Sequence, residues 1–376
     1  MTAGDPLLTV EDLRTYIRTD GEPTRAVDGV SFDVERGETV CLVGESGSGK
    51  SVTCESLTGI VPQPPAEVVG GEITFDGTSL TDADDAQLRQ VRGNRIAHVF
   101  QNPQGALDPV YSVGEQVVEA ITVHDDVPER VARERGVELL REVGIPRASD
   151  RFDEYPHEFS GGMRQRVAIA IALAADPDLV VADEPTTAVD VTVQARLLDL
   201  LGDLTDDGTA LLWVTHDLRV VAAVADRVLV MFGGTIVERG PVEAVFGAPG
   251  HPYTQALFDS YRGLSGRDEP TAREDIPTDG CRFRGQCPHA VLECGSDDQP
   301  SFYAVDERDD HTASCVYHDP GLEFDPEAVM ADARGVRPDE GSADRPETGA
   351  GVRSEGSTGG HPDEGTGTRP EEGTDD

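Results

Sequence analysis

Short apolar runs and longer amphipathic stretches alternate along the first 250 residues of the chain. The runs at 38–44, 178–185 and 210–217 are rich in β-branched residues and end in glycine or polar side chains, which predicts buried strands of a parallel sheet. The stretches at 113–121 and 130–145 repeat their apolar positions every three to four residues, which predicts amphipathic helices. The pattern therefore indicates an α/β protein.

Other segments predict antiparallel strands beside this parallel arrangement. The sequences at 29–38 and 71–77 suggest an antiparallel β patch near the amino terminus. Residues 228–240 predict a strand, a Gly-Gly turn and a second strand. Because helical periodicity is concentrated between 95 and 174, we expect residues 95–174 to form a helical part inserted into one α/β unit.

A glycine-rich loop joins the run at 38–44 to a helix-compatible stretch. Its sequence GESGSGKS fits the phosphate-binding loop, in which glycines let backbone N–H groups surround the phosphates. Lys50, the only lysine of the chain, would reach between the β- and γ-phosphates as a compact ammonium, and Ser51 would bind Mg²⁺. The predicted nucleotide-binding residues of the loop are Gly44, Glu45, Ser46, Gly47, Ser48, Gly49, Lys50 and Ser51.

Two further predicted strands end in side chains suited to phosphate chemistry. Asp183 and Glu184 end the run at 178–185, where a second magnesium contact and a base that polarises the attacking water are expected. His216 ends the next run and can sense the γ-phosphate. Three parallel strands with polar tips predict a nucleotide-binding edge of the sheet.

A second anion-binding feature is predicted within residues 158–177. Ser160 can cap a helix whose first turn contains Gly161 and Gly162, which leaves N–H donors and the positive end of the helix dipole open to an anion. Since the chain already has one phosphate-binding loop, we expect this helix end to serve the nucleotide of another subunit.

The charge balance excludes one class of partner. The chain has 31 Lys plus Arg against 72 Asp plus Glu, a formal net charge of −41, which argues against nucleic acid. Repulsion of this size is screened in molar salt, where the Debye length is about 3 Å. Together with the near absence of lysine, the acid excess suggests a salt-loving cytoplasm.

The sequence shows neither a membrane span nor a leader. No apolar run approaches the ~20 residues that cross a bilayer, and no basic stretch followed by a hydrophobic one opens the chain. We therefore expect a soluble protein that stays where it is made. Residues 319–376 repeat Gly, Pro, Glu, Asp and Thr, which predicts a disordered acidic tail, with a docking tail as the alternative.

Four cysteines are grouped late in the chain. They are Cys281, Cys287, Cys294 and Cys315. In a cytosol such a group favours metal ligation over disulfides. Four thiolates could bind tetrahedral Zn²⁺ or a [4Fe–4S] cluster, and unligated cysteines are a third possibility. His289, His311 and His318 are near enough in sequence to allow mixed ligation.

In their order along the chain, these motifs resemble those of the nucleotide-binding subunit of ABC transporters. The matching sequences are the phosphate-binding loop, VFQNPQGALDP with Gln101, FSGGMRQR, VVADEPTTAVD and WVTHD, within about residues 7–250. The resemblance implies a P-loop NTPase fold that binds ATP and Mg²⁺ in a head-to-tail dimer. Phe159 and Met163 depart from the common LSGGQ signature, and Met163 lacks the side-chain hydrogen bond of glutamine.

The same resemblance implies roles for residues that the pattern alone does not assign. Gln101 would contact Mg²⁺ and the membrane subunit, and Asp190 would cross the dimer interface. Tyr16 would stack on adenine. The surface around 106–113 would meet the membrane subunit, although these residues could also be a loop over the helical core.

Two observations indicate which class of ABC protein the sequence resembles. Only about 130 residues without sustained heptads separate the glycine loop from DEP, and the chain has one such loop, which disfavours DNA-repair ATPases and twin-cassette translation factors. The sequences at 247–260 and 281–320 resemble the extension of oligopeptide and dipeptide importer ATPases. That likeness also favours the iron–sulfur cluster over zinc at the four cysteines.

The resemblance thus implies the ATP-hydrolysing subunit of a peptide importer at the cytoplasmic side of the cell membrane. Its partners would be two membrane permease subunits, a second ATPase that is related or identical, and an external solute-binding protein. We expect an ABC ATPase domain over 1–250, the cysteine-bearing extension over 251–318 and then the tail. A nickel importer, and a regulatory module that binds ATP with little turnover, stay open as alternatives.

Overall fold

The computed structural model describes residues 5–19, 21–101, 103–124, 126–185, 191–261, 276–295 and 298–322. All of these residues belong to one compact unit, Met1–Pro326, which is described here by itself. Asp190 and the predicted tail beyond residue 322 lie outside the described residues.

The larger sheet has eight strands within the described residues, in the order β11-β12-β10-β9-β3-β8-β7-β6. In chain order these are β3 (Thr39–Val43), β6 (Ile96–Val99), β7 (Leu179–Asp183), β8 (Ala210–Val214), β9 (Arg227–Phe232), β10 (Thr235–Pro241), β11 (Tyr303–Val305) and β12 (Arg308–Ala313). The strands from β6 to β9 pair in parallel, whereas β10, β12 and β11 are added antiparallel. Every residue of β3 and β8 is buried, as the continuous apolar runs predict.

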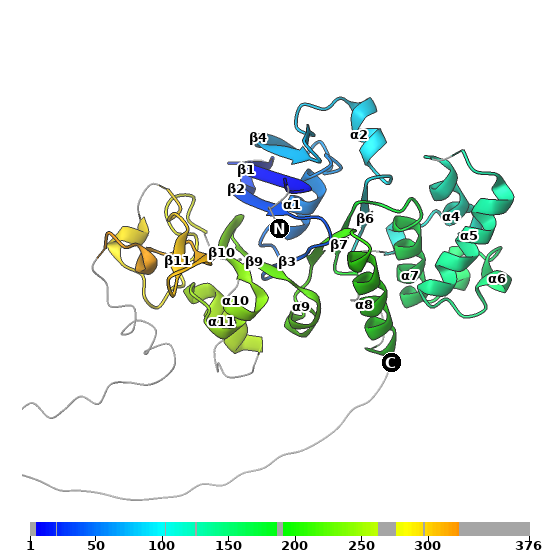
Figure 1. The fold of residues 1–376 in the computed structure, drawn as a ribbon. Helices are drawn as coiled ribbons and strands as arrows, with labels where there is room; N and C mark the ends of the chain where they lie inside the picture. The colour runs from blue at the N-terminus through cyan, green and yellow to red at the C-terminus, as the bar shows by residue number, and fades with distance from the viewer. Residues whose placement is uncertain are drawn as a thin grey trace, which may run out of the picture. The chain divides into compact units, whose positions relative to one another are not determined.

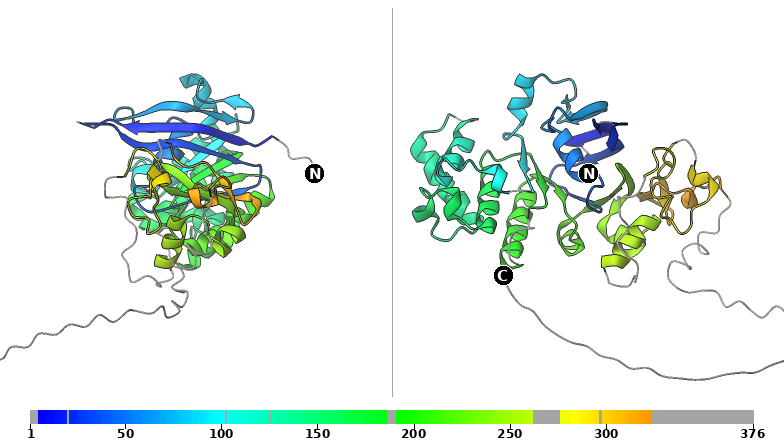
Figure 2. Two further views of the ribbon diagram at one scale, coloured as in Figure 1. Left: turned by 90° about the vertical axis from the view of Figure 1, so that its left-hand side faces the viewer. Right: turned by 180° about the vertical axis from the view of Figure 1, so that it is seen from behind.

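The smaller sheet is antiparallel and confirms the predicted amino-terminal patch. Its strands are β1 (Leu8–Ile17), β2 (Thr24–Val34), β4 (Ala66–Phe75) and β5 (Thr78–Ser79), in the order β2-β1-β4-β5. Figure 2 shows these blue strands running along one side of the unit, next to the green strands of the larger sheet. One cluster of buried apolar side chains, which includes Leu8 and Phe32 from the small sheet and Leu42 and Leu212 from the large one, joins the two.

Helices pack against the larger sheet, and a further group of helices lies beyond one of its edges (Figure 1). They are α1 (Lys50–Ser56), α2 (Asp85–Val91), α3 (Pro103–Ala106), α4 (Val113–Thr122), α5 (Glu129–Glu142), α6 (Ala148–Arg151), α7 (Gly161–Ala172), α8 (Val191–Asp206), α9 (Leu218–Val224), α10 (Val242–Gly247) and α11 (Pro252–Tyr261), with short 3₁₀ helices at η1 (Pro156–Glu158), η2 (Leu292–Gly295) and η3 (Val316–His318). In Figure 1, α4, α5 and α6 gather beyond β6, away from the edge that ends in β11. The predicted helical part at 95–174 therefore contains β6, a strand of the sheet, before its helices begin.

The carboxyl-terminal extension continues the larger sheet. Strand β12 pairs with β10, with Glu238 opposite Ala313. The fully buried carboxylate of Glu238 accepts hydrogen bonds from the N–H groups of Gly250 and His251 at 2.7 and 2.8 Å and lies 2.8 Å from Nε2 of His311. Because one buried carboxylate joins β10, the start of α11 and β12, the extension is held firmly against the sheet.

Candidate active site

The loop between β3 and α1 lies in close contact with neighbouring strands, and two glycines permit this. At Gly44, with φ of +153°, an added Cβ would lie 2.2 Å from the carbonyl oxygen of Met231. At Gly49, with φ of +107°, it would lie 2.2 Å from that of Ala26. No side chain fits at such distances, so the loop needs glycine at both positions.

Lys50 is held inside this loop. Its side chain is buried, and Nζ donates hydrogen bonds to the carbonyl oxygens of Gly44 and Glu45 at 2.8 and 2.6 Å and to Oγ of Ser48 at 3.3 Å. Burial lowers the pKa of Lys50, and the nearby charge of Glu184 opposes that shift. The ammonium is thus placed as a cation whose oxygen partners can be exchanged for phosphate oxygens.

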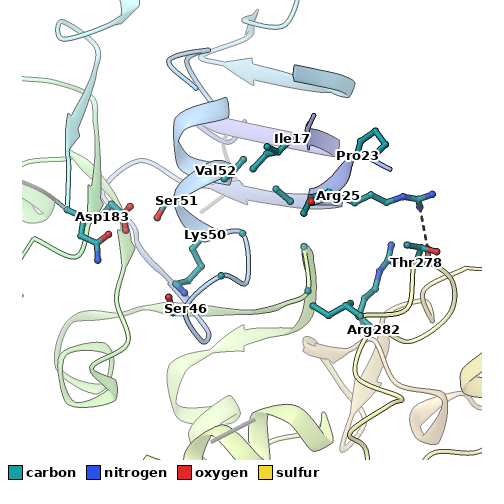
Figure 3. Close-up of a pocket in the computed structure, with 18 of the residues that line it drawn as sticks. Ile17, Pro23, Arg25, Ser46, Lys50, Ser51, Val52, Asp183, Thr278 and Arg282 are labelled. Carbon is teal, nitrogen blue, oxygen red and sulfur yellow. Dashed lines mark hydrogen bonds between the residues drawn. The ribbon is translucent and has the colours of Figure 1, made fainter. Parts of the chain in front are cut away.

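A cavity of about 530 Å³ opens in front of the loop. Figure 3 shows Ser46, Lys50, Ser51 and Asp183 toward one end of it and Arg25 and Arg282 toward the other. The predicted site residues that line it are Ser46, Gly47, Gly49, Lys50, Ser51, Gln101, Asp183 and Glu184. Gly44, Glu45 and Ser48 belong to the same loop but are not among the lining residues.

Two side chains from separate segments contact the carboxylate of Glu184. Nε2 of Gln101 donates to Oε2 of Glu184 at 2.9 Å, and Nδ1 of His216 lies 3.0 Å from Oε1. Glu184 has a positive φ of 47°, an uncommon conformation that functional sites often contain. The structure therefore fixes both oxygens of this carboxylate at the tips of β7 and β8, where the sequence predicted a nucleotide-binding edge.

Ser51 and Asp183 form the oxygen-rich part of the cavity. The Ser51 hydroxyl hydrogen-bonds the Asp183 carboxyl, whose pKa is raised by burial and held down in part by this bond. A hydroxyl and a carboxylate are ligands that Mg²⁺ accepts when phosphate oxygens and waters complete its shell. These residues therefore fit the predicted magnesium ion, which would neutralise phosphate charge.

Tyr16, the predicted adenine-stacking residue, is not among the residues that line the cavity, whereas its neighbour Ile17 is. The Tyr16 hydroxyl donates a hydrogen bond of 2.8 Å to Oδ1 of Asp28. Successive side chains of a strand point to opposite faces, so both residues cannot face the nucleotide. The stacking role stays a prediction that this geometry does not favour.

The helix α7 begins as predicted, away from this cavity. Ser160 caps it by accepting a hydrogen bond from the Met163 N–H at 3.3 Å. An added Cβ at Gly161 would meet no atom within 4 Å, so the helix start is open. Ser160, Gly161 and Gly162 do not line the cavity of their own chain.

The four late cysteines are free thiols in one region of the extension. Burial raises the pKa of Cys281 to about 11 and of Cys287 and Cys315 to about 12, and the other three cysteines all influence Cys315 electrostatically. Within the described residues, no group of three or more His, Cys, Asp or Glu side chains is arranged to hold a metal ion. This arrangement therefore gives no support to a metal site at these cysteines, whether for zinc or for an iron–sulfur cluster.

Two of the three histidines considered for mixed ligation have other partners. Nε2 of His311 contacts Glu238, as described above, and Nε2 of His318 lies 2.9 Å from the carbonyl oxygen of Gly250. One imidazole contact of the group was not suggested by the sequence: Nε2 of His251 lies 4.0 Å from Sγ of Cys281.

Tyr253 on α11 supports the glycine loop, a role that the sequence did not predict. Its hydroxyl accepts a hydrogen bond of 3.0 Å from the backbone N–H of Glu45. The ring is fully buried, with its centroid 4.6 Å from that of Phe232 and 5.5 Å from that of Phe283. The only hint in the sequence was the likeness of 247–260 to importer ATPases, which carried no role for this residue.

Comparisons with known proteins agree with this geometry. The sequence profile described as "ABC transporter" matches residues 27–187, and the profile described as "Oligopeptide/dipeptide transporter, C-terminal region" matches residues 237–294. A probable peptide ABC transporter ATP-binding protein of Sinorhizobium fredii is 48% identical over 301 residues, which cover 77% of this chain and 89% of the relative. This chain belongs to the ABC transporter family of ATP-binding cassettes.

A further relative and a solved structure match most of this chain. The oligopeptide transport ATP-binding protein AppD of Bacillus subtilis is 44% identical over 326 residues, which cover 84% of this chain and 98% of the relative. Among solved structures, a dimeric ATP-binding cassette in a post-hydrolysis state with ADP and Pi matches with a TM-score of 0.58 and 28% identity, over 62% of this chain and 98% of that one. No helix of the cassette, within the described residues, is long and apolar enough to cross a membrane.

Proposed function

We propose that this cassette hydrolyses ATP to energise the import of dipeptides or oligopeptides through a membrane complex. The observation that carries the proposal is the meeting of Gln101 and His216 on the carboxylate of Glu184, at the edge of the cavity that Lys50 lines. The names of the relatives, which are peptide and oligopeptide transport ATP-binding proteins, support the cargo class.

Each residue has a defined task in this proposal. Lys50 and the loop amides bind the triphosphate, and Ser51 and Asp183 hold its magnesium ion. Glu184, whose two oxygens are fixed by neighbours, orients a water molecule toward the γ-phosphorus and accepts its proton while the bond to ADP breaks. His216 then reports the presence of the γ-phosphate from the exposed side of the carboxylate.

The experiment replaces Glu184 with glutamine. Glu184→Gln keeps the size and hydrogen-bonding capacity of the side chain but cannot accept the proton, so phosphate release should stop while ATP stays bound. Phosphate release and bound nucleotide are measured on the same preparation. Turnover at the wild-type rate would exclude Glu184 as the base.

The second ATPase subunit is part of the proposal. The open start of α7 at Ser160, Gly161 and Gly162 would close over the nucleotide of a neighbouring cassette, and Asp190, which lies outside the described residues, would contact that neighbour. The solved dimer bound to ADP and Pi supports such an assembly. Whether the neighbour is a second copy or a related ATPase is decided by mass measurement of the purified complex.

The permease contact is proposed at residues 106–113. Val110 and Tyr111 are 73% and 53% exposed, which is unusual for large apolar side chains and typical of a contact surface. Ser112 and Glu115 form a capping box at the start of α4, which fixes this surface to a helix. An external solute-binding protein would deliver the peptide to the permeases.

We propose a [4Fe–4S] cluster, rather than zinc, at Cys281, Cys287, Cys294 and Cys315. The likeness of residues 281–320 to the extension of oligopeptide and dipeptide importer ATPases supports the cluster over zinc. The buried thiols would lose their protons on assembly. Anaerobically purified protein should absorb broadly near ~400 nm, and a colourless protein with stoichiometric zinc would exclude the cluster.

The remaining proposals concern organisation and habitat. We assign 1–250 to the ATPase domain, 251–318 to the extension and 319–376 to an acidic tail, with the sheet pairing of β10 and β12 joining the first two. The net charge of −41 supports adaptation to high salt. Unfolding temperatures should then rise from dilute buffer to molar salt.

A further inference from the structure

The end of the cavity that lies away from Ser51 and Asp183 is built partly by the carboxyl-terminal extension. Ile276, Thr278 and Arg282 line it together with Ile17, Pro23 and Arg25 of the ATPase domain. Figure 3 shows the side chains of Arg25 and Arg282 on the side opposite Asp183. Residues separated by more than 250 positions in sequence thus line one continuous space with the glycine loop.

Arg282 is rigidly placed at this end. Its side chain is 7% exposed, forms an ion pair with Asp28, which is itself 4% exposed, and donates a hydrogen bond to the carbonyl oxygen of Pro277. Arg25 donates to the carbonyl oxygen of Thr278 at 3.3 Å, which joins the extension to β2 a second time. The wall is therefore a built part of the cavity.

The extension also packs on the turn between β9 and β10. An added Cβ at Gly233 would lie 3.0 Å from a methyl carbon of Ile276 and 3.3 Å from Cβ of Arg282. Since the same turn contacts the glycine loop through the Gly234 N–H and the Ser48 carbonyl at 2.9 Å, the wall and the loop share one support.

The charge at this end favours an electron-rich ligand. Asp28 is the shared partner of Arg14 at 3.6 Å, of Arg25 at 3.3 Å and of Arg282, and Arg14 also pairs with Asp12 at 2.9 Å, so three guanidinium groups face two carboxylates. Burial lowers the pKa of Arg282 in spite of this carboxylate. A planar guanidinium with unmatched charge stacks well on the face of an aromatic ring system.

We propose that Arg282, Ile276 and Ile17 form the binding site for the nucleoside part of ATP, so that the extension completes the nucleotide pocket. This inference rests on the proposed ATPase function. The triphosphate extends from Lys50 and Ser51, and the base lies against Ile17 and Ile276 with the guanidinium of Arg282 at its face. The base would be recognised without a stacking aromatic from β1, because Tyr16 does not line the cavity.

The experiment compares two ligands that differ only in the nucleoside. Binding of ATP and of inorganic tripolyphosphate, both with magnesium, is measured by calorimetry on the full chain. Arg282→Lys keeps a positive charge beside Asp28 but loses the planar group, so ATP should bind about tenfold more weakly while tripolyphosphate binds as before. Arg284→Lys is the matched control, because Arg284 pairs with Asp279 at 3.1 Å and does not line the cavity.

A second variant avoids the buried ion pair. Ile276→Ala shortens the apolar wall without touching Asp28, and ATP should again lose several-fold in affinity relative to tripolyphosphate. Ile17→Trp should change the ratio of the two affinities in the opposite direction, because base–aromatic stacking strengthens binding about five- to a hundredfold.

The outcomes separate the inference from the proposed function. Equal loss of ATP and tripolyphosphate binding in Arg282→Lys would assign the residue to the phosphates and overturn the inference, as would unchanged ATP binding in both extension variants. A wild-type chain that binds neither ligand would instead overturn the proposed function.

Discussion

The two ends of the cavity are built by different physical means. At the phosphate end, one continuous loop places a buried ammonium and backbone groups, and the end of β7 brings the carboxylates of Asp183 and Glu184. At the opposite end, Arg282 of the extension lines the same cavity and forms a buried ion pair with Asp28. The phosphate end therefore holds the residues of the proposed reaction, whereas the ion pair at the opposite end also stabilises the fold.

Lys50→Ala gives the largest expected effect on turnover and tests the phosphate end. Loss of the ammonium removes a charge-assisted contact to the transferred phosphoryl group, which typically slows catalysis about 10²- to 10³-fold, or ~3–4 kcal/mol. Phosphate release under saturating ATP measures it, and thermal unfolding checks that the fold is kept. Lys50→Arg should fail nearly as badly, since the broader guanidinium does not fit the loop. Full activity in either variant would contradict this account of the loop.

Asp28→Asn tests the nucleoside end. It should lower the free energy of unfolding more than it lowers ATPase activity. The substitution leaves the buried guanidinium of Arg282 without its counter-charge, which costs ~3–5 kcal/mol in comparable buried pairs. Urea unfolding measures it. Asp279→Asn is the control, because Asp279 is exposed where it pairs with Arg284, and exposed pairs contribute about 0.2–1 kcal/mol. Similar losses from both variants would mean that the buried pair does not support the extension.

The contrast between the ends also explains what the sequence could predict. The glycine loop is local, so its residues are recognised from spacing alone, and parallel strands bring Asp183, Glu184 and His216 to one edge whatever the loops between them do. Gln101 came only from the family likeness, and the structure places it 2.9 Å from Glu184.

The nucleoside end depends on long-range pairing that spacing does not encode. Arg282 reaches the cavity because β12 pairs with β10 far along the chain. The choice between Tyr16 and Ile17 depends on which face each side chain takes in β1. The pairing of β1 with β2 shifts register three times, including between Thr15 and Tyr16, so the alternation cannot be counted from the strand's start.

Tyr253→Phe asks whether the extension also supports the phosphate end. The change removes only the hydroxyl that accepts the Glu45 N–H, which leaves a buried donor unpaired at a typical cost of ~1–3 kcal/mol. We expect lower stability in urea and weaker binding of tripolyphosphate as well as ATP, because the loop itself loosens. Tyr261→Phe is the control, since that hydroxyl pairs with Asp217 on an exposed side chain. If Tyr253→Phe binds tripolyphosphate and ATP as tightly as the wild type does, the extension contributes to the nucleoside end alone.

The smallest expected effect is a change in how the free energy of unfolding depends on pH. His98 on β6 lies 2.9 Å from the Thr58 hydroxyl through Nε2, which ties β6 to the segment after α1. Burial, aided by the charge of Arg92, lowers the pKa of His98 to about 4. Between that value and the ordinary one near 6.5, the unfolded chain binds more protons than the folded chain, so stability falls as the pH falls.

His98→Gln removes this titration while keeping a polar group near Thr58. The slope of the unfolding free energy against pH, between pH 6.5 and 4, should then be shallower than in the wild type by at most ~1.4 kcal/mol per pH unit. Above pH 6.5 the two slopes should coincide, because His98 is neutral in both states there. His157→Gln, at an exposed histidine, should keep the wild-type slope. Equal slopes for His98→Gln and the wild type would mean that His98 does not contribute to the pH dependence of stability.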